Sequence, residues 1–309
     1  MTNKNHTLVK DFLLLGFGNL HEFKILVFTV FLVLHIIALT SNVLVVVLVV
    51  FIRSLHSPMY IFISQLSLSE IVFTSNIVPN MLWLILVGGG KVSVARCFFQ
   101  FYLLAVPVVA QCLLLASMSF DRYLAICKPL HYASIMSIRH QLKISTFCWS
   151  MALMIAFVLY ALLCSIEFCG PNTIDHFFCD ISPVVELSCS GNPAVQLVTF
   201  VFSFPFVVCP FMFIIATYIS ILRTILKIPS TTGRHKAFST CSSHLIIVNL
   251  YYGTLAIGST PIFPSNINSV SPNKILSLLY IFLTPLINPL IYSLRNQEMR
   301  NVIRKFTYV

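Results

Sequence analysis

Charged residues are scarce in this chain. Asp, Glu, Lys and Arg make up 9% of its 309 residues, against about a quarter in typical soluble domains. Hydrophobic residues make up 58%, and the mean hydropathy is +0.93. These values exclude an ordinary soluble domain and indicate that most of the chain lies in lipid.

The chain also lacks a basic cluster and the sequence patterns of enzymes. Its net charge is +10, but the cations are scattered between apolar runs, which excludes a nucleic-acid partner and favours an anionic membrane surface. No H-E-x-x-H or G-x-S-x-G motif is present, and no cysteine has an evident metal partner. We therefore expect no enzymatic activity, no cofactor and no metal site. A transporter or channel is the rival class, although the sequence shows neither an internal repeat nor a ring of charges.

Seven apolar runs are each long enough to cross a bilayer as a helix, which takes about 20 residues. Backbone groups in lipid must bond within the spanning segment, so these runs predict an all-α membrane protein, a bundle of seven transmembrane helices. We expect one domain that covers residues 1–309. The predicted spans are 25–52, 58–87, 98–120, 144–166, 194–222, 238–260 and 275–294.

The distribution of cations predicts which side each chain end faces. With the N-terminus outside, the cytoplasmic segments hold 13 of the 19 Lys and Arg residues and two acids, whereas the outer segments hold six cations and six acids. Cytoplasmic loops carry the excess of Lys and Arg, so we expect the N-terminus outside and the C-terminus inside. The glycosylation sequon at Asn5 agrees, because it would face the exterior. The expected parts are an extracellular leader at 1–22, the helix bundle at 23–294 and a cytoplasmic tail at 295–309.

Four of the ten cysteines fall in segments that this orientation places outside, where an oxidising environment permits disulfides. They are Cys97, Cys169, Cys179 and Cys189. Four cysteines allow three sets of pairs, and their spacing does not choose between them.

Two groups of polar residues interrupt the apolar runs. Asp121 and Arg122 lie at the cytoplasmic end of the third run, where opposite charges can neutralise each other and still reach water. Glu70 is the only formal charge well inside a run. We expect it to belong to a polar core. The expected members of that core are Asn42, Glu70, Gln111 and Asn288.

Five segments carry a likeness to one receptor family. They are LHSPMY at 55–60, MSFDRYLAIC at 118–127, KPLHY at 128–132, KAFSTCSSHL at 236–245 and PLINPLIYSLRN at 285–296. These segments, in this order, resemble the characteristic motifs of odorant receptors, a branch of the rhodopsin-like G-protein-coupled receptors. The likeness covers nearly the whole chain.

The resemblance implies an odorant receptor of the plasma membrane, expected in the cilia of olfactory neurons. Such a receptor binds a small volatile or hydrophobic ligand and activates an olfactory-type stimulatory G protein, which raises cyclic AMP. The resemblance also implies the disulfides Cys97–Cys179 and Cys169–Cys189, which would hold a long loop over the bundle. A receptor for lipids or peptides is the nearest alternative, since its signalling parts would be the same.

The resemblance implies a switch at the cytoplasmic end of the bundle. In rhodopsin-like receptors the Asp-Arg-Tyr triplet takes part in admitting the G protein, and the proline of N-P-x-x-Y kinks a helix that needs two arrangements. No acid lies within residues 223–245, so the arginine has no acidic partner on the sixth helix. The implied switch residues are Asp121, Arg122, Tyr123, Tyr218, His244, Asn288, Pro289 and Tyr292.

The third run holds no Asp or Glu within residues 98–120, so it lacks the carboxylate that would bind a cationic amine. We expect a neutral ligand, bound mainly by apolar contact in the outer half of the bundle. Leu104, Ala105, Val108 and Val109 recur on one helix face, and alignment with the family's motifs implies the remaining contacts. Those are Phe202, Ser203, Phe206, Tyr252, Leu255, Ser259, Leu278 and Ile281, with Ser203, Tyr252 and Ser259 as polar anchors.

The last residues combine apolar and basic side chains. Met299, Val302, Ile303 and Phe306 recur at helical spacing, with basic residues between them. We therefore expect a short amphipathic helix on the cytoplasmic leaflet.

Overall fold

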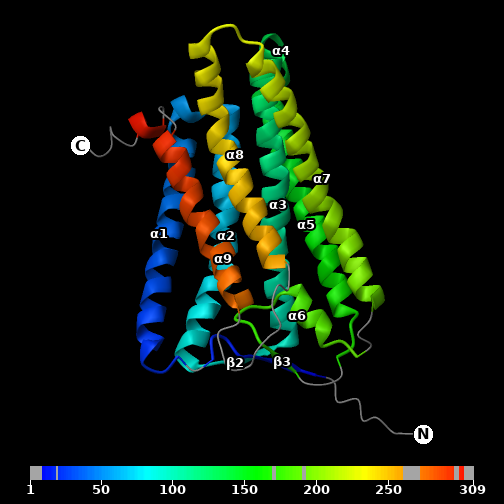
Figure 1. Cartoon of the computed structure of the whole chain (residues 1–309). Helices are drawn as coiled ribbons and strands as arrows, with labels where there is room; N and C mark the ends of the chain where they lie inside the picture. The colour runs from blue at the N-terminus through cyan, green and yellow to red at the C-terminus, as the bar shows by residue number, and fades with distance from the viewer. Residues whose placement is uncertain are drawn as a thin grey trace.

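The computed structural model describes residues 9–18, 20–168, 172–189, 193–259, 272–295 and 299–302. Within them, seven helices of 24 residues or more lie side by side as a bundle (Figure 1). Each of the seven predicted spans corresponds to one of these helices. They are α1 (Lys24–Phe51), α2 (Pro58–Val87), α3 (Val94–Cys127), α5 (Ile138–Cys164), α7 (Pro193–Leu226), α8 (Thr231–Ser259) and α9 (Pro272–Arg295).

The helices are apolar to different degrees. Among the described residues, six helices are long and apolar enough to cross a membrane. The exception is α8. Its first half contains the basic residues Arg234 and Lys236 and a polar run at 239–243, which lower the hydropathy of the helix. Helix α3 extends beyond its predicted run at both ends, because charged side chains near helix ends reach water and do not stop the helix.

Local signals set several helix ends. α2 starts with Pro58, whose missing N–H is not needed in the first turn. It is followed by Gly88, which adopts the left-handed conformation (φ 80°) typical of the residue that terminates a helix. The Ser93 side chain caps α3 by accepting a hydrogen bond from the Arg96 N–H at 3.3 Å.

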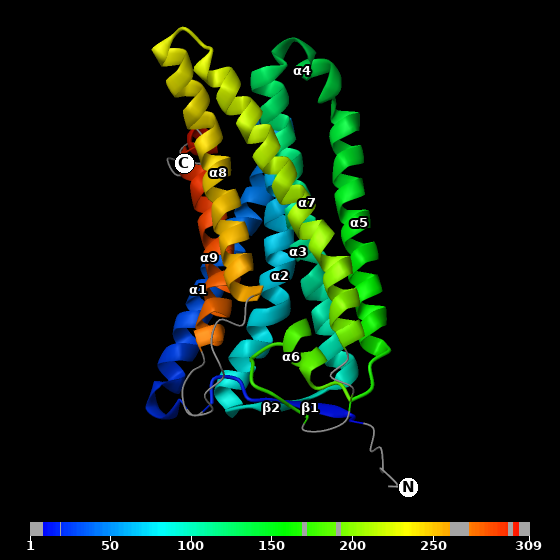
Figure 2. The same ribbon diagram turned by 45° about the vertical axis from the view of Figure 1, so that its right-hand side comes forward.

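A small sheet, which the all-α prediction did not include, joins three distant segments at one end of the bundle (Figure 2). β1 (Asp11–Leu14) lies between β2 (Gly90–Ser93), which is antiparallel to it, and β3 (Thr173–Ile174), which is parallel. Strands of two to four residues give too short a pattern to recognise in a sequence. The remaining short elements are the 3-10 turns η1 (His21–Phe23) and η2 (Arg53–Leu55) and the helices α4 (Pro129–Ile135) and α6 (Ile181–Glu186).

Helix α3 is central: it contacts α2, α5, α7 and α8. The buried side chains form two apolar clusters, one toward the sheet, with Phe12 and Ile281, and one toward the opposite end, with Met118 and Tyr292. We call the two ends of the bundle the sheet end and the Arg122 end. Residues 299–302 are helical, whereas Ile303 and Phe306 lie outside the described residues, so the amphipathic tail helix stays a prediction.

Candidate functional site

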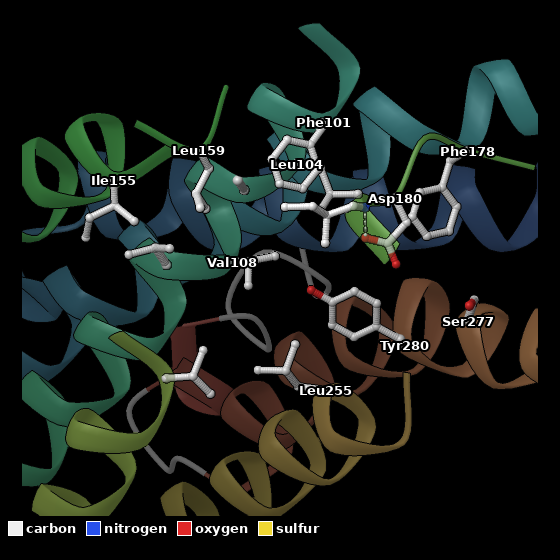
Figure 3. Close-up of a pocket in the computed structure, with 14 residues that line it drawn as sticks. Phe101, Leu104, Val108, Ile155, Leu159, Phe178, Asp180, Leu255, Ser277 and Tyr280 are labelled. Atoms are coloured by element: carbon white, nitrogen blue, oxygen red, sulfur yellow. Dashed lines mark hydrogen bonds between the residues drawn. The ribbon is translucent and has the colours of Figure 1, made fainter. Parts of the chain in front are cut away.

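A cavity of about 190 Å³ lies near the sheet end, between α3, α5, α7, α8, α9 and the loop before α6 (Figure 3). Five of the residues expected to contact a ligand line it. They are Leu104, Ala105, Val108, Val109 and Leu255. The helical spacing on α3 therefore identified the face of that helix that borders the cavity.

Other expected contacts lie elsewhere. Phe206, Leu278 and Ile281 pack in the apolar cluster at the sheet end, and they do not line this cavity. Tyr252 is buried in the other cluster, where its ring lies 4.7 Å from that of Phe211. The side chains of Phe202, Ser203 and Ser259 lie outside the described residues.

Nine lining residues were not expected. Two come from α5, one from the first part of α3, one from α7, two from α9 and three from the loop and the start of α6. They are Phe101, Ile155, Leu159, Phe178, Asp180, Ile181, Val207, Ser277 and Tyr280. Apolar residues on membrane helices carry no local signal that separates cavity lining from helix packing, because both favour the same side chains.

The N-terminal segment and the long loop between α5 and α7 cover the sheet end together. The Leu13 N–H donates to the Asn172 carbonyl at 2.7 Å, and the Gly16 N–H donates to the His176 carbonyl at 3.1 Å. Beside these bonds, the Phe17 ring stacks on Phe177 at 4.9 Å. We call this assembly, residues 9–18 with 172–180, the lid.

A disulfide fixes the lid to α3. Cys97 and Cys179 are bonded, as the resemblance implied, and the Cys179 N–H donates to the Gln100 side-chain oxygen at 3.1 Å. Cys189 is also disulfide-bonded, but its implied partner Cys169 lies outside the described residues, so that pairing stays a prediction.

A second polar contact ties the lid to α9. The Lys274 ammonium lies 2.6 Å from the Asp175 carboxylate, and the His176 ring nitrogen Nε2 lies 3.2 Å from the Ser277 hydroxyl. Burial, with a smaller contribution from the charge of Lys274, lowers the pKa of His176 to about 3. His176 is therefore neutral at physiological pH.

The polar core lies between the helices. The Asn288 amide donates to the Glu70 carboxyl at 2.9 Å, and the Asn42 amide donates to the Pro285 carbonyl at 2.9 Å. Gln111 is buried as well. The bond between Glu70 and Asn288 joins α2 to the proline-containing part of α9.

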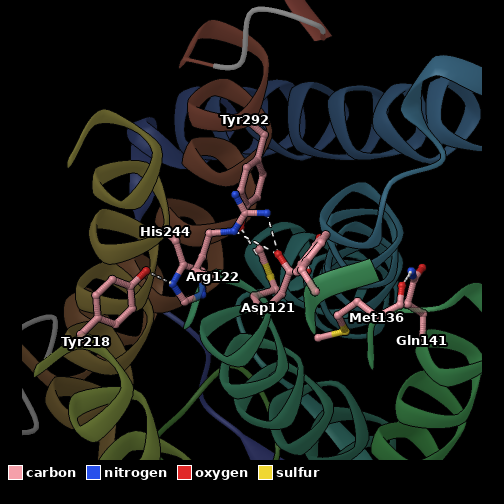
Figure 4. A network of polar contacts seen from close by, with 9 residues as sticks. Asp121, Arg122, Met136, Gln141, Tyr218, His244 and Tyr292 are labelled. Atoms are coloured by element: carbon pink, nitrogen blue, oxygen red, sulfur yellow. Dashed lines mark hydrogen bonds and ion pairs between the residues drawn. The ribbon is translucent and has the colours of Figure 1, made fainter. Parts of the chain in front are cut away.

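At the Arg122 end, the carboxylate of Asp121 accepts three hydrogen bonds from two partners (Figure 4). The Arg122 guanidinium contacts Asp121 Oδ2, with its nearest nitrogen at 2.6 Å. The Tyr132 hydroxyl of α4 donates to Oδ1 at 2.9 Å. Tyr132 was not among the expected switch residues, because the short helix that brings it to Asp121 folds back only in the tertiary structure.

The other expected switch residues fall in two places. The Tyr218 hydroxyl and the His244 ring nitrogen Nδ1 are 2.7 Å apart, and this contact links α7 to α8. His244 lies on the helix that has no acidic partner for Arg122 within residues 223–245. The Tyr292 hydroxyl lies 4.0 Å from the Met118 sulfur. Tyr123 stacks on Phe120 on the same helix, with ring centroids 6.4 Å apart. Pro289 lies inside α9.

Comparison with known proteins decides the family. The family model described as olfactory receptor matches residues 31–308. The chain belongs to the olfactory receptor family.

Individual human receptors are similar over almost their whole length. Olfactory receptor 10A3 is 42% identical over 99% of this chain and 96% of its own. Olfactory receptor 11A1 is 40% identical over 96% of this chain and 93% of its own, and olfactory receptor 6B1 is 38% identical over 100% and 98%.

Membership of the olfactory receptor family settles the broad class of this protein. It is an odorant receptor of the G-protein-coupled type, a multi-pass membrane protein and not an enzyme, and its partners are a small ligand and a G protein. The predicted seven-helix fold and the predicted family are confirmed.

Proposed function

We propose that this olfactory receptor binds a small, neutral, hydrophobic odorant in the cavity under the lid and activates an olfactory-type stimulatory G protein, which raises cyclic AMP. The observation that carries the proposal is the lining of the cavity, in which eleven of the fourteen side chains are purely hydrocarbon. Such a lining binds mainly by removing apolar ligand surface from water, which contributes about 25 cal/mol per Å².

The proposed orientation places the sheet end outside the cell and the Arg122 end in the cytoplasm. The disulfide of the lid supports it, because disulfides persist in oxidising compartments, and so does the excess of Lys and Arg in the opposite segments. In this orientation Asn5 is the glycosylation site, and the expected residence is the ciliary plasma membrane.

Contacts between helices offer a route from the cavity to the Arg122 end. Val108 lines the cavity, and its carbonyl accepts a hydrogen bond from the Tyr251 hydroxyl of α8 at 2.7 Å. The same hydroxyl lies 3.5 Å from the Cys112 sulfur. A ligand that binds more tightly when α3 and α8 shift relative to each other moves the population toward the shifted state.

We infer that the contact between Asp121 and Arg122 holds the receptor at rest. Asp121 is fully buried, and its Oδ2 accepts hydrogen bonds from two nitrogens of the Arg122 guanidinium, so release of the arginine requires this pair to separate. Activation would separate the helices, break the Tyr218–His244 contact and release Arg122 toward the G protein.

The experiment is a cyclic AMP screen of volatile compounds in cells that express the receptor and the olfactory stimulatory G protein. Val108→Phe fills the cavity and should lower the potency of every active compound at least about tenfold, a loss of about 1.4 kcal/mol. The matched control is Leu153→Phe, at a largely exposed position on α5, which should leave potency unchanged. A receptor that reaches the cell surface but raises cyclic AMP with none of the compounds would contradict the proposal.

A further inference from the structure

The oxygen atoms of the cavity come from few side chains. Asp180 of the lid and Ser277 and Tyr280 of α9 are the lining residues with side-chain oxygen. Figure 3 shows the Asp180 carboxylate and the Tyr280 hydroxyl directed into the same space. A ligand whose hydrocarbon part contacts α3 and α5 therefore has its other end near a carboxylate.

The position of Asp180 is fixed on both sides. It follows Cys179, which is bonded to Cys97 and hydrogen-bonded to Gln100. Its own Oδ1 accepts a hydrogen bond from the Ile181 N–H at 2.7 Å. Because these contacts hold the backbone, the carboxylate is placed before a ligand arrives, which reduces the entropy lost on binding.

The carboxylate retains capacity to accept hydrogen bonds. An ionised carboxylate offers about four acceptor positions. The two salt bridges within the described residues join Arg122 to Asp121 and Lys274 to Asp175, so neither involves Asp180. A hydrogen-bond donor on the ligand can therefore bond to the Asp180 carboxylate.

We propose that Asp180 selects the ligand by accepting a hydrogen bond from its hydroxyl group, so that the preferred ligands are small alcohols and phenols. The inference rests on the proposed ligand site and names the chemical class that the site takes. A ligand without a donor leaves the half-buried carboxylate of Asp180 without this partner, and sites built to pair with a ligand hydroxyl discriminate against analogues that lack it.

The cavity volume bounds the size of the alcohol. An apolar cavity of about 150 Å³ takes benzene, so by the same ratio a cavity of about 190 Å³ takes a molecule of roughly eight non-hydrogen atoms. A primary ammonium group is disfavoured, because the cost of removing its full charge from water can exceed its attraction to one half-buried carboxylate.

The test measures binding apart from signalling. Purified receptor in lipid nanodiscs is heated with increasing amounts of each probe, since a ligand that binds the folded state raises the unfolding temperature. The probes are benzyl alcohol with benzyl methyl ether, cyclohexylmethanol with its methyl ether, and benzylamine. Each alcohol should bind at least about tenfold more tightly than its ether.

Variants locate the effect at Asp180. Asp180→Asn keeps the size of the side chain and its capacity to cap α6, and it should reduce the alcohol-to-ether affinity ratio about tenfold. Glu186→Gln removes a nearby acid that is exposed on α6 and does not line the cavity, and it should leave the ratio unchanged. Asp180→Ser, also a helix-capping residue, serves as a second variant with the same expected loss.

Three results would overturn the inference: equal affinities within each alcohol and ether pair, a ratio that Asp180→Asn leaves unchanged, or tighter binding of benzylamine than of benzyl alcohol. The wild-type comparison needs no variant to fold. Cyclic AMP is measured with the same probes. Alcohols that bind without raising cyclic AMP would refute the proposed function alone, whereas ethers that bind and signal as well as alcohols would refute this inference alone.

Discussion

The Gln100 side chain of α3 accepts a hydrogen bond from the Cys179 N–H at 3.1 Å. The same amide group donates to the Asn76 carbonyl of α2 at 3.3 Å, and the Asn76 amide donates to the Gln100 carbonyl at 2.9 Å. One buried glutamine therefore joins two helices and the lid. Because Cys97 lies three residues earlier on α3, the disulfide and this hydrogen bond act on the same face of the helix.

Replacing Cys97 with serine should release the lid. The disulfide closes a separation of 82 residues, and loss of a native disulfide commonly costs about 2–5 kcal/mol of unfolding free energy. We expect a lower melting temperature of the purified receptor and less receptor at the cell surface. Cys164→Ser, at an exposed free cysteine on α5, is the control; an equal loss there would contradict the prediction.

Acidification should destabilise the receptor through His176. Its folded-state pKa of about 3 lies below the ordinary value of 6.5, so the unfolded chain binds the extra proton first. The full contribution of His176 to the free energy of unfolding is present above pH 6.5. It decreases as the pH drops toward 3, by about 2 kcal/mol at pH 5. His176→Gln does not titrate and keeps a donor toward Ser277, so its melting temperature should fall less between pH 7.5 and pH 5. If the melting temperatures of the wild type and of His176→Gln fell equally between these two pH values, His176 would not be the group responsible.

Removing the arginine of the switch should have two separable effects. Arg122→Ala leaves the fully buried Asp121 without its ion pair, which costs about 3–5 kcal/mol, and it removes the group proposed to meet the G protein. The double variant Asp121→Asn with Arg122→Ala should recover the melting temperature but not ligand-driven cyclic AMP. Recovery of both would show that the arginine has only a structural role.

Tyr132→Phe should raise signalling without ligand. The lost hydroxyl donates to Asp121 at 2.9 Å, and a hydrogen bond to a charged group contributes about 1.5–3 kcal/mol. Weakening the resting state by the lower value corresponds to about tenfold more active receptor. Ligand-free cyclic AMP, normalised to surface receptor, measures it. Ser134→Ala, on the same short helix but bonded only locally to His131, is the control.

The sequence determined the fold class. A spanning helix must satisfy its own backbone, so the number of apolar runs fixes the number of helices without reference to their packing. The α3 face of the cavity could also be predicted from the sequence. Helical periodicity alone places four of its residues on one face, namely Leu104, Ala105, Val108 and Val109. Asp121 and Arg122 were found because charges are rare in such a chain.

Only the tertiary structure decided which distant groups meet. Asp180 and Phe178 reach the cavity because a disulfide folds the loop onto α3, and Tyr132 reaches Asp121 because α4 turns back. In lipid, apolar side chains have nearly the same free energy on the bundle's interior and exterior, so composition does not report which ones face a cavity. Local periodicity and burial of polar groups are properties of one segment, whereas a binding site is a property of how segments pack.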